Sequence, residues 1–327
     1  MEIKDELRVA TVQFNANPRD KSLNLGNMKA FIKQASKQGC DLISFPEICI
    51  TGYNFILYTE DKQELLDIAE FVPNGDSTVQ IQEFAREFNI VILFGLLEKN
   101  EEEQLYNTYV CVSPEGFVQK YRKIHAFENS HLSQGNDFPI FDLFGWKCGT
   151  LICFDNNLPE NTRTYALNGC ELLFAPHQTG GFDMEVAGMG RIDVSLWKDK
   201  ERNKEILEKE FIGPKGREWL LKWLPSRAYD NGIFYVFSNG VGLDHDELRT
   251  GNAMIIDPNG IILSESKSID SDMVIANIQK SSLENTLGKM HMKTRNPELY
   301  SILTKKFDGK IDSRSARNEL TKNSTIR

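Results

Sequence analysis

The stretch KCGTLICFDNNLPENTR, residues 147–163, joins the end of an apolar strand to the start of a helix. The strand runs directly into Cys153, and Pro159 stands at the expected first turn of the following helix, a position where proline is favoured. A cysteine on such a turn can present its sulfur at the top of a sheet, by the geometry that exposes the serine of a nucleophile elbow. The stretch therefore predicts a strand–helix unit with Cys153 at the end of the strand.

The segments on either side of this unit alternate between strand and helix patterns, which predicts an α/β fold with helices on the outer face of a sheet. Strand patterns occur at residues 7–14, 41–46, 90–97, 171–175, 233–239, 253–258, 261–266 and 272–278. Helical spacing marks residues 23–37, 77–88, 159–168 and much of 183–231, with Ser22 and Ser77 as expected N-caps. Residues 105–124 and 138–153 each read as a β-hairpin.

The bulk composition is that of an ordinary globular protein. The 327 residues are 40% hydrophobic and 26% charged, with a formal net charge of -9, which argues against nucleic acid as the main partner. No apolar run approaches the roughly 20 residues needed to cross a bilayer, and the N-terminus has no signal-peptide pattern. We therefore expect a cytoplasmic protein with no membrane partner.

The six cysteines form no CxxC pair, so neither a zinc site nor a thioredoxin-like motif is expected; they stand at positions 40, 49, 111, 148, 153 and 170. A metal site could be sought among His125, His131, His177 and a nearby carboxylate. These histidines lie on expected loops without a short, regular ligand spacing, so we expect no metal.

Two further reactive side chains also follow strands. Glu47 comes directly after the apolar stretch 41–46, and Lys123 closes the second strand of the first hairpin. A carboxylate at the C-terminal end of a buried strand lies where α/β sheets place their sites. Each residue alone has an ordinary explanation as a surface charge, but three such strand ends could meet at one edge of the sheet.

Taken together and in this order, the motifs resemble those of the nitrilase superfamily of carbon–nitrogen hydrolases. The matching stretches are FPEICITGY (45–53), YRKIHAFE (121–128) and GTLICFDNNLPENTR (149–163), which departs only in having Leu158 where the family often has Phe. The resemblance runs from the first strand to RNPELYSILT, ending at residue 304.

The resemblance implies a fold and an assembly. It implies a four-layer α-β-β-α sandwich in a single domain, residues 1–304, that forms a homodimer or a higher homo-oligomer. Residues 305–327 form a polar, basic tail. Two interpretations of this tail stay open, a solvated and partly disordered end or an arm laid across a partner subunit.

The resemblance also implies roles. Cys153 is the expected nucleophile, Glu47 the proton-transfer base and Lys123 the stabiliser of the oxyanion, with no cofactor. The family has a second carboxylate seven residues before a glycine, a spacing that Glu128 and Gly135 match here. Its implied role is to orient the lysine or the substrate.

The residue pair after Cys153 bears on the substrate. It is Phe154-Asp155, which looks more like the amidase and N-carbamoyl amidohydrolase branches than the nitrile-hydrolysing members, where Trp-Glu is frequent. We expect a linear amide or an N-carbamoyl compound, with nitrile hydrolysis as the alternative activity. A catalytically silent binding or regulatory module is a third possibility, which the intact Glu47, Lys123 and Cys153 disfavour.

The expected substrate contacts include Phe154, the residue after the nucleophile. His177, Gln178 and Thr179 follow the strand at 171–175, and Arg191 lies in the segment 183–212. Arg191 could bind a carboxylate through its two-pronged guanidinium, or could form a surface salt bridge. The segment 183–212 looks longer than in the family and is expected to build part of the pocket rim.

Overall fold

The strands form two layers that are joined along one seam. The computed structural model describes residues 1–180 and 190–322, and its strands pair in the order β5-β4-β3-β2-β1-β9-β8-β7-β6. The first layer contains β1 (Glu6–Phe14), β2 (Leu42–Ser44), β3 (Val91–Lys99), β4 (Leu105–Ser113), β5 (Gly116–Arg122) and β13 (Asp272–Gln279). Here β1, β2 and β3 are mutually parallel, while β4, β5 and β13 are antiparallel to their neighbours.

The second layer also combines parallel and antiparallel strands. Its strands are β6 (Phe141–Leu143), β7 (Trp146–Thr150), β8 (Leu172–His177), β9 (Phe234–Asp244), β10 (Glu247–Thr250), β11 (Met254–Ile256) and β12 (Ile262–Glu265). β7, β8 and β9 are parallel, and both expected hairpins, β4–β5 and β6–β7, are present. β1 and β9 meet through two residue pairs, at the C-terminal end of β1 and the middle of β9: Gln13 with Asn239 and Phe14 with Gly240.

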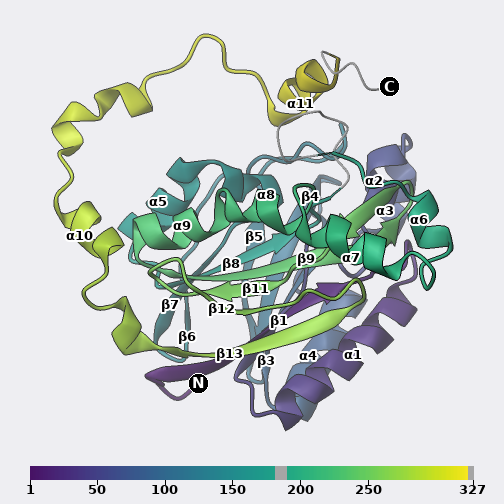
Figure 1. Ribbon diagram of the computed structural model, residues 1–327, viewed down its shortest axis with the longest axis horizontal. Coiled ribbons are helices and arrows are strands. Elements are labelled where there is room, and N and C mark those ends of the chain that lie inside the picture. Colours follow the sequence, from purple (N-terminus) through teal and green to yellow (C-terminus); the bar gives the residue numbers. More distant parts are fainter. Residues whose placement is uncertain (181–189, 323–327) are drawn as a thin grey trace.

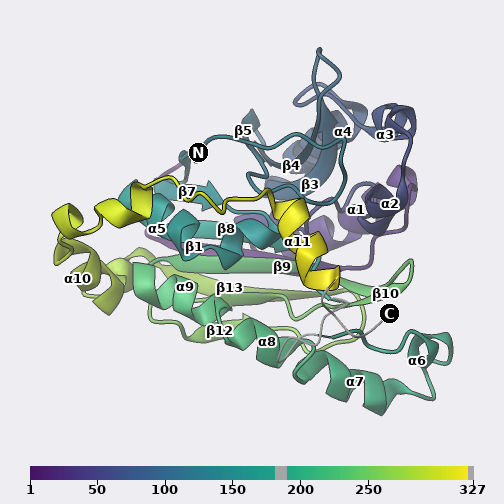
Figure 2. The ribbon, with the colours of Figure 1, turned by 90° about the horizontal axis from the view of Figure 1, so that it is seen from above.

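Helices cover the outer side of each layer, as the expected α-β-β-α sandwich requires (Figure 2). α1 (Lys21–Lys37) and α4 (Asp76–Phe88) pack on the first layer, and α5 (Pro159–Leu167), α8 (Arg217–Leu221) and α9 (Leu224–Asn231) belong to the second. Along β3, Ile92 and Phe94 join the cluster under α1 and α4, whereas Val91 and Leu93 face the other cluster. This strand is therefore apolar throughout because both of its faces are covered.

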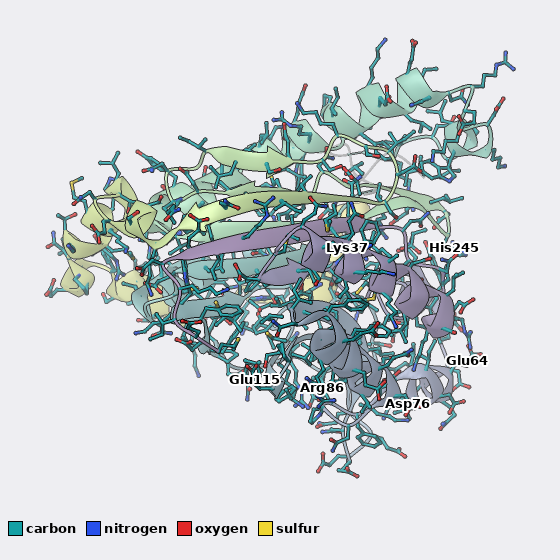
Figure 3. The ribbon with its side chains drawn as sticks, turned by 90° about the horizontal axis from the view of Figure 1, so that it is seen from below. Lys37, Glu64, Asp76, Arg86, Glu115 and His245 are labelled. Atoms are coloured by element: carbon teal, nitrogen blue, oxygen red, sulfur yellow. The ribbon has the colours of Figure 1, made fainter. Side chains whose placement is uncertain are left out.

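The N-caps differ from the expected ones. The side chain of Asp20 accepts a hydrogen bond from Leu23 N at 3.0 Å and caps α1, so Ser22 is already inside the helix. α4 begins after Gly75, and Ser77 instead binds Glu70 through its backbone N–H and its hydroxyl. The first prediction failed because Asp20, two residues earlier, takes the cap position, and the second because Ser77 binds Glu70, a partner that sequence spacing does not reveal. The charges of α4 still suit the helix dipole, with Asp76 in its first turn and Arg86 in its last (Figure 3).

The remaining helices lie at the margins of the sandwich. They are α2 (Asn54–Tyr58), α3 (Lys62–Ile68), α6 (Ser195–Lys198), α7 (Lys204–Ile212), α10 (Leu287–Lys293) and α11 (Ser313–Lys322). Within the described ranges, none of the helices is long and apolar enough to span a membrane. Residues 183–189 of the expected pocket-rim segment lie outside the described residues.

The C-terminal segment takes a course that composition did not suggest. After α10 the chain arches away from the body and returns to it at α11 (Figure 1). Several apolar side chains along the arch are exposed, namely Leu299, Ile302, Leu303, Phe307 and Ile311. The expected polar tail thus contains a helix that lies back against its own chain.

A close backbone approach fixes the turn that carries Glu47. A Cβ atom added at Gly95 in β3 would lie 2.3 Å from Ile48 N and 2.9 Å from Glu47 Cα. We predict that Gly95→Ala lowers the free energy of unfolding by about 1–3 kcal/mol, as overpacking does in other cores. Urea unfolding measures the loss.

The matched control is Gly26→Ala in α1, where an added Cβ meets no atom within 4 Å. Alanine there should be neutral or stabilising, because glycine inside a helix costs roughly 0.5–1 kcal/mol relative to alanine. Equal unfolding midpoints for the two variants would contradict the packing argument.

Candidate active site

Three strand ends deliver the reactive side chains. Glu47 follows β2, Lys123 follows β5, and Cys153 begins a short turn after β7. The backbone is left-handed at Ile48 (φ 44°) and at Cys153 (φ 48°), a conformation that is unusual for residues with a Cβ atom. Left-handed backbone at two of these strand ends is the kind of strain that clusters at functional sites.

Lys123 is fully buried and lies between two carboxylates. Its Nζ is 2.7 Å from Glu47 Oε1 and also binds Glu128 Oε1. Glu47 is fully buried and Glu128 nearly so. The spacing of Glu128 and Gly135 has a structural basis, since Gly135 N donates to Lys123 O and a Cβ at Gly135 would collide with Arg122 O.

Asn107 completes this cluster and was missed from the sequence. Its Nδ2 donates to Glu47 Oε1 at 2.6 Å and to Glu128 Oε1 at 2.9 Å, and its backbone carbonyl accepts from Lys123 N. The available signal was a single amide residue in the middle of the otherwise strand-forming LYNTYVCV. A buried amide there needs polar partners, which the two carboxylates supply.

Burial sets the protonation of the acids. It raises the pKa of Glu47 to about 7, against the lowering effect of the positive Lys123. Burial alone would raise the pKa of Glu128 too, but Lys123 and the hydrogen bonds bring it below its usual value. The Glu47 Oε2 atom is buried and has no hydrogen-bond partner among the described residues. Glu47 is therefore the carboxylate that can take up a proton near neutral pH.

The surroundings of the Cys153 thiol favour its protonated form. Burial raises its pKa to about 12, and the charge of Glu47 adds to this, while Lys123 and the backbone N–H of Gln178 act in the opposite direction. Of the six cysteines it is the one that is not fully buried. A thiol with so high a pKa needs a base before it can act as a nucleophile.

Asp155 ties the cysteine turn to the lysine strand. It accepts hydrogen bonds from the Tyr121 hydroxyl at 2.8 Å and from the backbone N–H groups of Ile124 and His125. His125 Nδ1 is also 2.8 Å from Asp155 Oδ1. Cys153 and Lys123 are thereby held to each other through a buried carboxylate two residues beyond the nucleophile.

The expected substrate-binding residues fall into two groups. Phe154 and Gln178 border the cluster: the Phe154 ring packs against Phe127 at 5.8 Å, and Gln178 Nε2 donates to Glu47 O at 2.7 Å. His177 is fully buried, with its ring nitrogens 3.0 Å from Asn156 Nδ2 and 2.9 Å from Thr179 Oγ1. This position leaves neither ring nitrogen of His177 for a substrate, and it favours a structural role.

Arg191 lies farther out, at the mouth of the site. Its Nη1 is 3.1 Å from Asp246 Oδ2 and its Nη2 is 3.5 Å from Glu247 Oε1, so of the two expected roles the salt bridge is present. A second arginine, Arg249, is buried behind it and was missed from the sequence. Arg249 donates to the backbone carbonyl oxygens of Gln178 and Gly180 and pairs with Glu247 at 2.8 Å.

The other histidines are held singly and not as a cluster. His131 Nε2 is 2.9 Å from Glu60 O, whereas His125 faces Asp155. Within residues 1–180 and 190–322, no group of three or more His, Cys, Asp or Glu side chains is arranged to hold a metal ion. The chemistry described above is that of a thiol, a base and a buried cation.

Comparison with known proteins assigns the chain to a family. The family described as carbon-nitrogen hydrolase matches residues 8–286. A nitrilase from Pyrococcus abyssi is 30% identical over 282 residues, covering 85% of this chain and 92% of its own length. An omega-amidase from Mus musculus is 26% identical over 313 residues, covering 91% and 98%.

Solved structures show the same fold. An amidase from Nesterenkonia sp. AN1 in complex with acrylamide aligns with a TM-score of 0.69 at 19% identity, covering 92% of this chain and 98% of that one. The chain therefore belongs to the carbon–nitrogen hydrolase family, within the nitrilase superfamily, and its fold is the nitrilase α-β-β-α sandwich.

The raised pKa of Glu47 has a consequence for stability. Its pKa is about 7 in the folded protein against 4.5 ordinarily, so ionisation from pH 4.5 upward opposes folding until pH passes about 7. We predict that Glu47→Gln, which cannot ionise, raises Tm relative to the parent more at pH 8 than at pH 5. Thermal unfolding at the two pH values measures this difference.

The control is Glu64→Gln on α3, an exposed acid labelled in Figure 3. Its Tm difference from the parent should be small and similar at both pH values. A Glu47→Gln effect that is equal at pH 5 and pH 8 would contradict the assignment of a raised pKa.

Proposed function

We propose that this carbon–nitrogen hydrolase is a thiol amidohydrolase that cleaves a linear amide or an N-carbamoyl compound through a thioester on Cys153. The observation that carries the proposal is the fully buried Lys123 held between Glu47 and Glu128 next to a strained cysteine turn. Burying one cation and two carboxylates costs free energy, so a cluster of this kind is typical of functional sites.

In the first step, Glu47 takes the proton from the thiol as the sulfur attacks the carbonyl carbon. Its raised pKa suits this exchange, because a base works best when its pKa is near the working pH. The carbonyl oxygen becomes negative, and Lys123 Nζ and the backbone N–H of Phe154 stabilise it. One such donor is worth roughly 3–4 kcal/mol in other enzymes.

In the second step, the tetrahedral adduct collapses. Glu47 gives its proton to the leaving nitrogen, ammonia or an amine departs, and a thioester remains on Cys153. Glu47 then removes a proton from water, whose oxygen attacks the thioester carbonyl, and returns that proton to the departing Cys153 sulfur as the acid is released. Glu128 and Asn107 act by positioning Lys123 and Glu47. Glu128 binds Lys123, Asn107 binds Glu47, and Glu128 and Asn107 also bind each other.

The relatives support an amide substrate. One structure of the Nesterenkonia amidase carries the acetamide moiety of fluoroacetamide added covalently at its active-site cysteine, at a TM-score of 0.67 and 19% identity. Nitrile hydrolysis is the second candidate, favoured by the 30% identity to the Pyrococcus nitrilase. We favour the amide because Phe154-Asp155 follows the cysteine and Asp155 is built into the site.

The decisive experiment measures ammonia release from linear amides, N-carbamoyl compounds and nitriles. We predict that Cys153→Ala abolishes release from whichever class the parent hydrolyses, with an unchanged circular dichroism spectrum, because the thioester cannot form. Mass spectrometry after brief iodoacetamide treatment should find Cys153 labelled first, since the other five thiols are buried.

Cys40→Ala is the control, because Cys40 lies in a different part of the structure, near Asp41 and Arg8. It should retain normal activity. Ammonia release that survives Cys153→Ala, or that is lost equally in Cys40→Ala, would overturn the nucleophile assignment.

We also propose that the chain forms a homodimer through its C-terminal arch, residues 294–312. Leu299, Ile302, Leu303 and Phe307 are each well over half exposed, and burial of such side chains against a second copy would be favourable. Leu303→Asp should shift the protein toward monomer in sedimentation velocity at micromolar concentration.

Leu23→Asp on α1, which is also exposed but belongs to a helix away from the arch (Figure 1), should leave the dimer intact. A parent protein that sediments as a monomer would refute this assembly.

A further inference from the structure

Arg249 in β10 is, like Lys123, a buried cation held between two carboxylates. Its side chain is almost fully buried, with Nη2 2.8 Å from Glu247 Oε2 and Nε 3.5 Å from Asp244 Oδ2. Burial lowers the pKa of Arg249, but Glu247 and Asp244 raise it more, so the guanidinium stays charged. Burying such a group costs free energy, and the steps of the proposed reaction give it no task.

The remaining donors of Arg249 reach the backbone that follows β8. Its Nη1 donates to Gln178 O at 2.7 Å and to Gly180 O at 3.1 Å. Gly180 and Arg249 also form an antiparallel bridge, and a Cβ atom added at Gly180 would lie 2.5 Å from Leu248 O. Close packing and a charged donor therefore both hold the segment 178–180 against β10.

Within this segment, Gln178 contacts both the expected nucleophile and the expected base. Burial is the largest influence on the pKa of the Cys153 thiol and raises it, whereas the hydrogen bond from the backbone N–H of Gln178 to the sulfur lowers it. The side-chain Nε2 of Gln178 donates to Glu47 O at 2.7 Å. A shift of this short segment would therefore change the surroundings of Cys153 and Glu47 together.

Arg249 also reaches the chain beyond the Glu47 turn. Its Nη2 donates to Asn54 Oδ1 at the start of α2, and Asn54 Nδ2 donates to Asp244 O at 2.6 Å. The guanidinium thus joins three segments: the end of β8, the start of α2, and the β9–β10 hairpin, whose turn carries the labelled His245 (Figure 3). These contacts fix the position of the guanidinium itself.

We propose that Arg249 is a positioning residue for the Cys153 nucleophile. By binding the carbonyl oxygens of the segment 178–180, it holds the backbone N–H of Gln178 on the sulfur. That N–H stabilises the negative charge that grows on the sulfur as its proton leaves. The role rests on the proposed function, in which Cys153 attacks the substrate.

The test measures how fast iodoacetamide alkylates Cys153 in the parent and in Arg249→Lys, at several pH values between about pH 7 and pH 9. Lysine keeps a positive charge for Glu247 and Asp244, but it lacks the fixed fork of donors that a guanidinium presents. Alkylation should slow about tenfold at each pH, as expected for one lost hydrogen bond to a charged group, because the thiolate is the reacting form. On an amide that the parent hydrolyses, kcat should fall by a similar factor, with KM changed less than about twofold.

The direction of the change separates positioning from a purely structural role. A substitution that only loosened the packing would expose the partly buried thiol further and speed its alkylation. Faster or unchanged alkylation of Cys153 in Arg249→Lys would therefore overturn the proposal.

Arg217→Lys is the matched control. It removes the guanidinium of α8 that binds Glu265 through two hydrogen bonds, at 2.6 Å and 3.1 Å, and that makes none of the contacts described for the site. Alkylation of Cys153 and kcat should stay at the parent values. A tenfold loss in this control would show that the effect of Arg249→Lys is not specific, and would count against the proposal.

A second measurement needs no change at Arg249. In protein labelled with ¹⁵N-glutamine, the backbone amide signal of Gln178 is identified by its loss in Gln178→Asn. This signal should move in Cys153→Ala, because the N–H loses the sulfur as its acceptor. A signal that stays in place would overturn the contact on which the proposal depends, even if Arg249→Lys does not fold.

The outcomes also separate this role from the proposed reaction. Slower alkylation in Arg249→Lys, with no ammonia release by the parent from any amide, N-carbamoyl compound or nitrile, would support the positioning role and contradict the reaction. Ammonia release by the parent, with unchanged alkylation in Arg249→Lys, would overturn the positioning role alone.

Discussion

The burial of Lys123 between Glu47 and Glu128 is the constraint on which the rest of the site depends. A lone ammonium could not stay charged there, and neither could two carboxylates without it. Because the three groups neutralise one another only in part, the pKa of Glu47 settles near 7 while that of Glu128 stays low. Two acids with the same ionisable group thus acquire different properties from position alone.

The sandwich brings three strand ends together at one site. Gly95 lets β3 pass under the Glu47 turn, Gly135 lets the loop fold back on the lysine strand, and Asp155 links that strand to Cys153. These supports come from both β layers. The cost is left-handed backbone at Ile48 and Cys153, which the packing around them must offset.

Sequence reasoning proposed Glu47, Lys123 and Cys153 because each follows a strand and because the three motifs together resemble those of the nitrilase superfamily. It did not find Asn107, which lies inside a strand and is recognisable only once its partners across the site are known. It treated residues 305–327 by composition, as a polar tail. The return of α11 to the body depends on tertiary contacts such as Arg314 with Asn129, which composition does not encode.

The position of α11 at the very end of the chain has a consequence for biosynthesis. All three strand ends have left the ribosome well before Arg314 is made, so the reactive cluster can assemble while one wall of the adjoining cavity, which Glu128 and Arg314 both line, is still missing. The same holds for a chain that a protease has clipped in the exposed arch before α11. Such a chain keeps Glu47, Lys123 and Cys153 but lacks one wall of the cavity beside them.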